Sequence, residues 1–170
     1  MPNLLRGLIS ARSCTLVPMS FAHTAHVVRW RNDPDISQWF LEQRQFDPAS
    51  HEAWLTRTLA SQKDINWIIE DNGGAAIGAL GLYDIDWVEK RAEFGRFVIG
   101  AHEARGKGFA KDALRALLVA ASGAGLRLVY LYVKHNNVSA VSLYKTLGFE
   151  FSEYSQADII CMSIKLETKK

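Results

Sequence analysis

The sequence predicts an α/β (α+β-like) domain with three layers, in which helices cover a mixed sheet. Strand-like and helix-like segments follow one another as strand, helices, three strands, helix, strand, helix and two strands. The Asp-Asn-Gly-Gly turn signal at 71–74 joins two apolar runs as a hairpin. Apolar residues at 110–121 recur at helical spacing and form one buried face. This order is typical of a layered domain with one core system.

Each element rests on a local pattern. Ser20 is a suitable N-cap for a helix that ends near Arg31, and the Asn-Asp-Pro segment at 32–34 breaks that helix. The run at 36–41 is either a second short helix or irregular. The expected strands are 14–18, 65–70, 76–83, 91–99, 128–133, 149–153 and 159–166, and the other expected helices are 51–60, 109–121 and 139–147.

Length and charge narrow the class of protein. The chain has 170 residues and no linker, repeat or low-complexity segment, so we expect one domain over 1–170, with residues 1–12 as a flexible lead. The formal charge of +2 is too small to indicate a nucleic-acid or membrane partner. We expect the chain to be a monomer or a homodimer.

The two cysteines, Cys14 and Cys161, lie far apart and lack the spacing of metal ligands. We expect both to be buried thiols, and we expect no metal site. This cysteine usage fits a reducing cytoplasm. No apolar run is long enough to span a bilayer.

An anion site is indicated at the hexapeptide Arg105-Gly106-Lys107-Gly108-Phe109-Ala110, which lies between a strand and a helix. Glycine lets a backbone approach a ligand closely, and the first N–H groups of a helix have no internal partner. Arg105 and Lys107 add positive charge. A solvated basic turn is the alternative interpretation of the same residues. The spacing matches neither a P-loop nor a dinucleotide fingerprint.

This loop resembles the pyrophosphate-binding loop of the GNAT superfamily of acetyl-CoA-dependent N-acetyltransferases. A second segment, with Asn137, Ala140, Tyr144 and Gly148-Phe149, is similar to the family's Asn-x-x-Ala-x-x-x-Tyr-x-x-x-Gly-Phe pattern. The resemblance covers nearly the whole chain from residue 15. It implies a largely antiparallel sheet of about seven strands whose central strands, at 91–99 and 128–133, splay apart to admit the pantetheine arm.

The resemblance also implies the cofactor contacts. Acetyl-CoA is the expected co-substrate, with the hexapeptide on its pyrophosphate and backbone groups near the end of the preceding strand on its pantetheine amides. The residues expected to bind it are Phe97, Val98, Ile99, Arg105, Gly106, Lys107, Gly108, Phe109, Ala110, Asn137, Ser139 and Tyr144.

Two residues are candidates for acid–base chemistry. Tyr144 is the expected acid, because a phenol stays protonated at neutral pH and can donate to a leaving thiolate. Glu93 is the expected base, acting through water, as a carboxylate does at this strand in many GNAT members. Asp84, Asp86 and His135 remain alternatives. A water held by the cavity with no single base is a further alternative.

The N-terminal third is expected to bind the acceptor amine. The residues expected to do so are Arg31, Asn32, Trp39, His51 and Trp54. Core packing for Trp54 and helix-dipole compensation for Arg31 are the alternatives. The segment at 31–34, the aromatic pair at 39–40 and the helix that bears His51 and Trp54 look most like those of the flagellin and surface-glycan acetyltransferases, which act on nucleotide-linked amino sugars. In that case Arg31 or Arg44 would meet phosphates.

Two further acceptor and function classes remain open. A similar Trp-Arg-Asn segment occurs in ribosomal-protein N-terminal acetyltransferases, which makes a protein α-amine the second expectation. A non-catalytic acyl-CoA-binding module is the alternative from another class.

Overall fold

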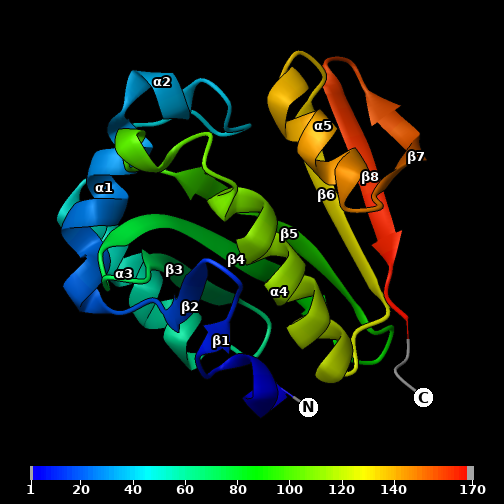
Figure 1. Cartoon of the computed structure of the whole chain (residues 1–170), viewed down its shortest axis with the longest axis horizontal. Helices are drawn as coiled ribbons and strands as arrows, with labels where there is room; N and C mark the ends of the chain where they lie inside the picture. Colours follow the sequence, from blue (N-terminus) through cyan, green and yellow to red (C-terminus); the bar gives the residue numbers. More distant parts are fainter. Residues whose placement is uncertain (1, 168–170) are drawn as a thin grey trace.

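The computed structural model describes residues 2–167, which form an eight-stranded sheet with helices on both faces (Figure 1). The strand order is β1-β2-β3-β4-β5-β6-β8-β7. The strands are β1 (Ile9–Ser10), β2 (Cys14–Pro18), β3 (Ile65–Asp71), β4 (Ala76–Asp86), β5 (Arg91–Ile99), β6 (Leu128–Lys134), β7 (Glu150–Gln156) and β8 (Ile159–Lys165). The helices are α1 (Thr24–Asn32), α2 (Pro34–Ser37), α3 (Pro48–Ala60), α4 (Phe109–Gly123) and α5 (Val138–Thr146), with 3₁₀ turns η1 (Pro2–Leu5), η2 (Phe21–His23) and η3 (His102–Ala104).

The sheet is antiparallel throughout, except where β5 lies beside β6. That parallel pair covers only Arg91–Glu93 of β5 and Leu128–Tyr130 of β6. Beyond this pair, β5 continues to Ile99 and β6 continues to Lys134, and the two strands no longer pair with each other. The expected mixed sheet with splayed central strands is thus confirmed, with β1 as an additional strand.

A β-bulge at Arg96 accompanies this separation. Gly81 pairs with Gly95 and Ala79 with Val98, so three steps along β5 oppose two steps along β4. Arg96 itself has a φ of 53°, in the left-handed region. A bulge bends its strand and increases the local twist. It therefore helps to carry the end of β5 away from β6.

The predicted flexible lead at 1–12 is wrong within the described residues. Leu5 and Ile9 are buried, and η1 and β1 both contact α4. The apolar residues of this segment cover the end of α4, which explains why it is ordered against the fold.

Another difference concerns Pro34. This proline ends α1, as expected, but it is also the first residue of α2, a position at which a proline loses no hydrogen bond.

Two apolar clusters lie on opposite faces of the sheet. The larger contains the buried side of α4 with residues of β2, β3, β4, β5 and β6, and it extends to Tyr144 and Phe149. The smaller joins α1, α2 and α3 to the other face through Met19, Val27, Trp30, Ile36, Leu55, Ile68, Ala79 and Val98. Alternation along β3 explains the division, because Trp67 and Ile69 enter the first cluster and Ile68 the second.

Both cysteines are buried free thiols, as expected. No helix within residues 2–167 is long and apolar enough to cross a membrane.

The end of β5 touches α1 so closely that Gly100 cannot carry a side chain. A Cβ at Gly100 would lie 2.2 Å from the ring of Trp30, which is buried. Because an indole ring cannot flex, the helix or the strand end must move to accept a methyl group. We therefore expect Gly100→Ala to lower the free energy of unfolding by about 1–3 kcal/mol.

Chemical denaturation measures this effect, and Gly123→Ala is the matched control. A Cβ at Gly123, the last residue of α4, meets nothing within 4 Å. Equal stability of the two variants would contradict the close contact between Trp30 and Gly100.

Candidate active site

The separated ends of β5 and β6 open into a cavity of about 880 Å³. This volume is in the range of pockets that hold small ligands and cofactors. Its wall combines the residues that follow β5, the first turn of α4, one side of α5, and α1 to α3. Sixteen of the residues that the sequence singled out line it: Arg31, Trp39, His51, Trp54, Glu93, Phe97, Val98, Ile99, Arg105, Gly106, Gly108, Phe109, Ala110, Asn137, Ser139 and Tyr144.

The glycine loop presents backbone donors to this cavity. Gly106 and Gly108 have φ values of 72° and 85°, a conformation that residues with a side chain rarely adopt. Gly108 is the N-cap of α4, so no side chain there occupies the first N–H groups of the helix. Lys107 is exposed and does not line the cavity. The loop therefore offers helix N–H groups and the helix dipole to an anion.

Arg105 lies folded against the end of β5. Its Nε donates to the carbonyl of Ile99 at 3.0 Å, and Nη1 is 3.3 Å from Nδ1 of His102. The Nη2 atom is buried and has no partner among the described residues. A cationic donor without a partner beside free helix N–H groups fits the pyrophosphate of acetyl-CoA. The same bond occupies the carbonyl of Ile99, one of the residues at the strand end whose backbone the family resemblance assigned to the pantetheine amides.

Tyr144 reaches the cavity from α5. Asn137 is the N-cap of this helix, and its side-chain oxygen accepts from the N–H of Ala140 at 3.3 Å. The Tyr144 ring packs edge-on against Phe94 and tilted against Phe149. Burial raises the pKa of Tyr144 above its usual range, because the phenolate would lose its hydration. The phenol therefore keeps its proton at any ordinary pH.

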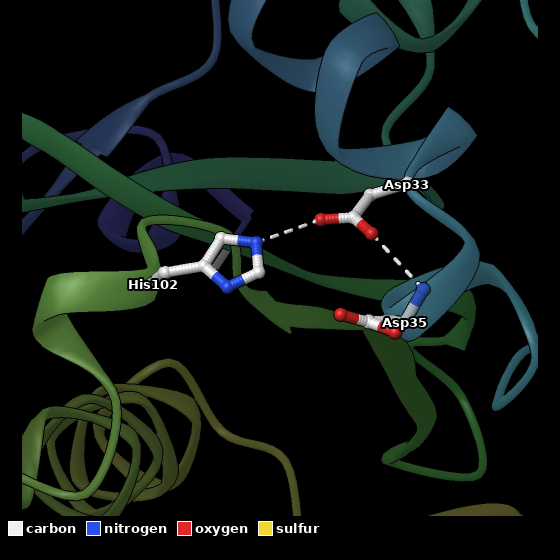
Figure 2. A group of neighbouring side chains, drawn as sticks. All are labelled: Asp33, Asp35 and His102. Atoms are coloured by element: carbon white, nitrogen blue, oxygen red, sulfur yellow. Dashed lines mark hydrogen bonds and ion pairs between the residues drawn. The ribbon is translucent and has the colours of Figure 1, made fainter.

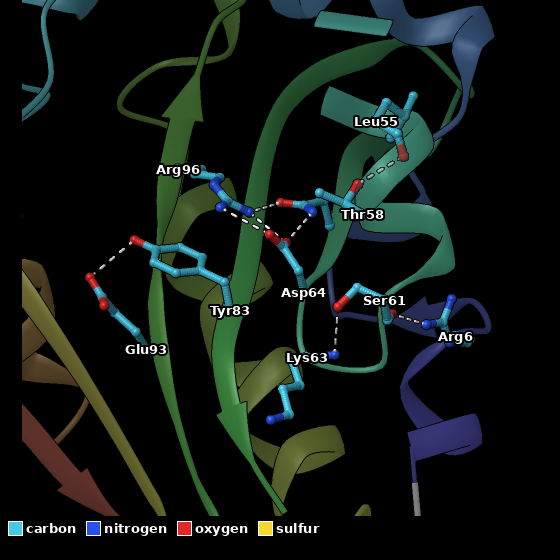
Figure 3. A network of polar contacts seen from close by, with 10 residues as sticks. Arg6, Leu55, Thr58, Ser61, Lys63, Asp64, Tyr83, Glu93 and Arg96 are labelled. Atoms are coloured by element: carbon cyan, nitrogen blue, oxygen red, sulfur yellow. Dashed lines mark hydrogen bonds and ion pairs between the residues drawn. The ribbon is translucent and has the colours of Figure 1, made fainter. Parts of the chain in front are cut away.

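Glu93 lies on β5 directly opposite Tyr83 of β4. The Tyr83 hydroxyl donates to Oε1 of Glu93 at 3.3 Å (Figure 3). Burial raises the pKa of the Glu93 carboxyl, and the Tyr83 hydrogen bond opposes part of that change. A half-buried carboxylate with a raised pKa is a chemically suitable proton acceptor.

The competing bases lie elsewhere. Asp86 accepts the N–H groups of Val88 and Glu89 in a turn, Asp84 is exposed, and His135 lies 3.8 Å from a carboxylate oxygen of Asp158. Neither aspartate nor the histidine lines the cavity. Glu93 is thus the candidate base that the geometry retains.

The acceptor side of the cavity contains four of the five residues expected there. His51 is buried beside Trp54, with ring centroids 5.3 Å apart, and burial lowers its pKa. Asn32 does not line the cavity. Its amide instead forms two hydrogen bonds with the backbone of Phe46, at 2.8 and 2.7 Å. The expected role of Asn32 in substrate binding is therefore replaced by a structural one.

Sequence reasoning missed Arg96, which lies at the bulge of β5 and lines the cavity. Its Nη atoms donate to Asp64 at 2.6 and 3.1 Å and to Asn66 at 2.9 Å (Figure 3). Its guanidinium also lies over the ring of Tyr83, 4.1 Å from the centroid. A charged residue between Gly95 and the apolar end of the strand, Phe97 to Ile99, was the signal that could have identified it.

A small polar cluster of Asp33, Asp35 and His102 lies at the edge of the cavity, and only Asp35 of the three lines it (Figure 2). Asp33 accepts from the N–H of Asp35 at 3.0 Å and lies 2.9 Å from Nε2 of His102. Both contacts lower the pKa of the Asp33 carboxyl, the His102 contact most. Capping of α2 and tethering of η3 account for the cluster.

A hydrogen bond also connects the two halves of the sheet across the cleft. Lys134, at the end of β6, donates from Nζ to the carbonyl of Gln38 at 2.6 Å. It connects the segment after α2 to the β6 side of the cavity.

The family can now be assigned. A family model described as an acetyltransferase (GNAT) domain matches residues 14–150. The chain belongs to the GNAT acetyltransferases. It is 33% identical over 116 residues to a spermidine N(1)-acetyltransferase of Vibrio cholerae serotype O1. The aligned residues cover 67% of this chain and 65% of that relative.

Solved structures show the same fold. A spermidine N-acetyltransferase from Vibrio cholerae in complex with CoA and spermine superposes with a TM-score of 0.83 at 23% identity, covering 92% of this chain and 97% of that one. A dodecameric structure of the Vibrio cholerae enzyme has a TM-score of 0.75 at 25% identity and covers 91% and 94%. These relatives are named as polyamine enzymes, whereas the sequence had suggested amino-sugar or ribosomal-protein acetyltransferases.

The glycine loop generates a binding prediction. Gly108→Glu places a carboxylate against the expected pyrophosphate position, so we expect binding of CoA to be lost in calorimetry. Gly108→Ala introduces the same backbone strain as Gly108→Glu but adds no charge, and it should therefore retain part of the affinity for CoA. Gly123→Glu adds the same charge at the far end of α4 and should bind like the wild type. Unchanged affinity of a folded Gly108→Glu variant would place the cofactor elsewhere.

Proposed function

We propose that this protein is an acetyl-CoA-dependent N-acetyltransferase that transfers the acetyl group directly to a primary amine of a small molecule. One observation carries the proposal. A single cavity between the separated strands brings together the anion-binding loop, the carboxylate of Glu93 and the phenol of Tyr144. Family membership supports the same activity.

The chemistry divides among few groups. Bound acetyl-CoA would supply the activated thioester. Glu93 accepts a proton from the amine, directly or through a water, and Tyr144 holds at its Oη the proton that a leaving thiolate sulfur requires. Side-by-side binding of both substrates contributes on the order of 7–11 kcal/mol through orientation. Proton transfer adds roughly 10²–10⁴-fold in rate.

The acceptor class follows from the relatives and the cavity wall. The relatives are named as spermidine N(1)-acetyltransferases, which favours a small amine as acceptor. Glu93, Asp35 and Glu42 line the cavity and are able to bind an ammonium group. The comparisons give no support to a protein α-amine or to a nucleotide-linked amino sugar. The expected monomer or homodimer stays a prediction. A structural relative forms a dodecamer, so a larger assembly is an alternative to it.

Mass spectrometry of a reaction with acetyl-CoA and pooled amines, spermidine included, tests the activity. Acetylated product that depends on enzyme supports the proposal. Binding of CoA without any acetylated amine would instead favour a non-catalytic acyl-CoA-binding module.

Tyr144→Phe should lower kcat by roughly 10²-fold or more and leave the KM for acetyl-CoA nearly unchanged. The reason is that the hydroxyl proton is used only in the transition state, while the ring keeps its contacts with Phe94 and Phe149. Steady-state kinetics measure both constants. Wild-type kcat in the variant, with pre-steady-state data showing that chemistry limits the rate, would exclude Tyr144 as the acid.

Glu93→Gln should lower kcat and change the pH profile. Glu93 accepts protons only when ionised, and burial moves its pKa upward from 4.5. Activity is therefore lost as the pH falls through that raised pKa, at a higher pH than for an exposed carboxylate. The variant should lack this acidic loss and keep only the titration of the acceptor amine. An unchanged profile would assign the base role to water or another group.

A further inference from the structure

Arg31 occupies an unusual position in the acceptor side of the cavity. It extends from the end of α1, and its guanidinium carbon lies 3.7 Å from the centroid of the Phe40 ring and 4.5 Å from that of Phe46. These rings hold the guanidinium in place but accept no conventional hydrogen bond. Its Nε is buried and has no hydrogen-bond partner in the described part of the chain.

The other arginines on this side of the cavity have carboxylate partners. Arg96 is paired with Asp64 at 2.6 Å, and Arg44 lies 3.5 Å from Glu42. Within residues 2–167, no carboxylate lies within ion-pair distance of Arg31, although Asp35, Glu42 and Glu93 line the same cavity. Among the arginines on this side of the cavity, Arg31 is therefore the one without an ion-pair partner in the described part of the chain.

The surroundings of Arg31 disfavour its positive charge. Burial, together with the charges of Arg96 and Arg44, lowers the pKa of Arg31 to about 10, against the opposing attraction of Glu42. At neutral pH the guanidinium remains charged. A partly desolvated charge without an ion partner destabilises the free protein, and an anion bound there would relieve that cost.

We propose that the acceptor amine carries an oxyanion, a carboxylate or a phosphate, and that Arg31 binds it. Planar guanidinium groups recognise both oxyanions through paired N–H donors. The inference rests on the proposed acetyltransferase function and specifies its substrate class. It also separates this chain from its named relatives, because spermidine carries only positive charge and gains nothing from a buried arginine.

Two pairs of amines that differ by one oxyanion test the substrate class. Lysine differs from cadaverine by a carboxylate, and O-phosphoethanolamine differs from ethanolamine by a phosphate. We expect the wild-type kcat/KM to be higher for at least one oxyanion-bearing member than for its twin and for spermidine. The pair that shows the preference identifies whether carboxylate or phosphate is bound.

Variants of Arg31 assign the preference to this residue. Arg31→Gln should lower kcat/KM for the oxyanion-bearing amine roughly 10- to 100-fold more than for spermidine or for the twin that lacks the oxyanion. Arg31→Lys keeps the charge and should be intermediate. Arg29→Gln removes an exposed charge from the same helix outside the cavity and should behave as the wild type.

A binding measurement keeps the two proposals separable. Calorimetry with O-phosphoethanolamine and with lysine on the CoA-saturated protein should show binding of one of them that Arg31→Gln abolishes, while CoA affinity is retained. Acetylation of spermidine without any oxyanion preference would overturn this inference alone. Absence of turnover for every amine would instead overturn the proposed function, and calorimetry would still decide the role of Arg31. An equal loss for all amines in Arg31→Gln would overturn the inference and indicate a structural role.

Discussion

The three-residue parallel pairing of β5 with β6 is the constraint on which the site depends. A parallel pair must use evenly spaced hydrogen bonds along both strands, and here that ladder ends at Glu93. The strands beyond it lose a neighbour on one side, which exposes backbone and opens the cavity. Burial of α4 across the sheet supports the open arrangement, because its apolar face holds the strands together away from the gap.

The bulge at Arg96 places one cation inside this opening, and the carboxylate of Asp64 compensates its charge. The bidentate pair with Asp64 and the bond to Asn66 use the guanidinium donors, and the Tyr83 ring lies against it. Tyr83 in turn donates to Glu93. One irregular residue thus connects the strand geometry to the environment of the candidate base. Arg31 contrasts with it, since aromatic rings hold its guanidinium and no carboxylate of the described residues forms an ion pair with it.

Most of the architecture could be predicted from sequence, because hydrophobic period and turn residues are local signals. The glycine loop, α4 and the hairpin at 71–74 are of this kind. The ordered segment around Leu5 could not be predicted, since its burial depends on a distant helix. The pairing of Asn32 with Phe46 and of Arg96 with Asp64 likewise joins residues far apart in the chain. The sequence located the residues that line the cavity but not which of them already had partners.

The division of the interior into two apolar clusters has an evolutionary consequence. Side chains near the cofactor loop belong to the cluster of α4 and α5, whereas Trp30 and the neighbours of Arg31 belong to that of α1 to α3. Substitutions in the second cluster leave the packing of the first intact. Substitutions in the second cluster can therefore change the acceptor that is bound, while the loop and helices that bind the acyl donor stay unchanged.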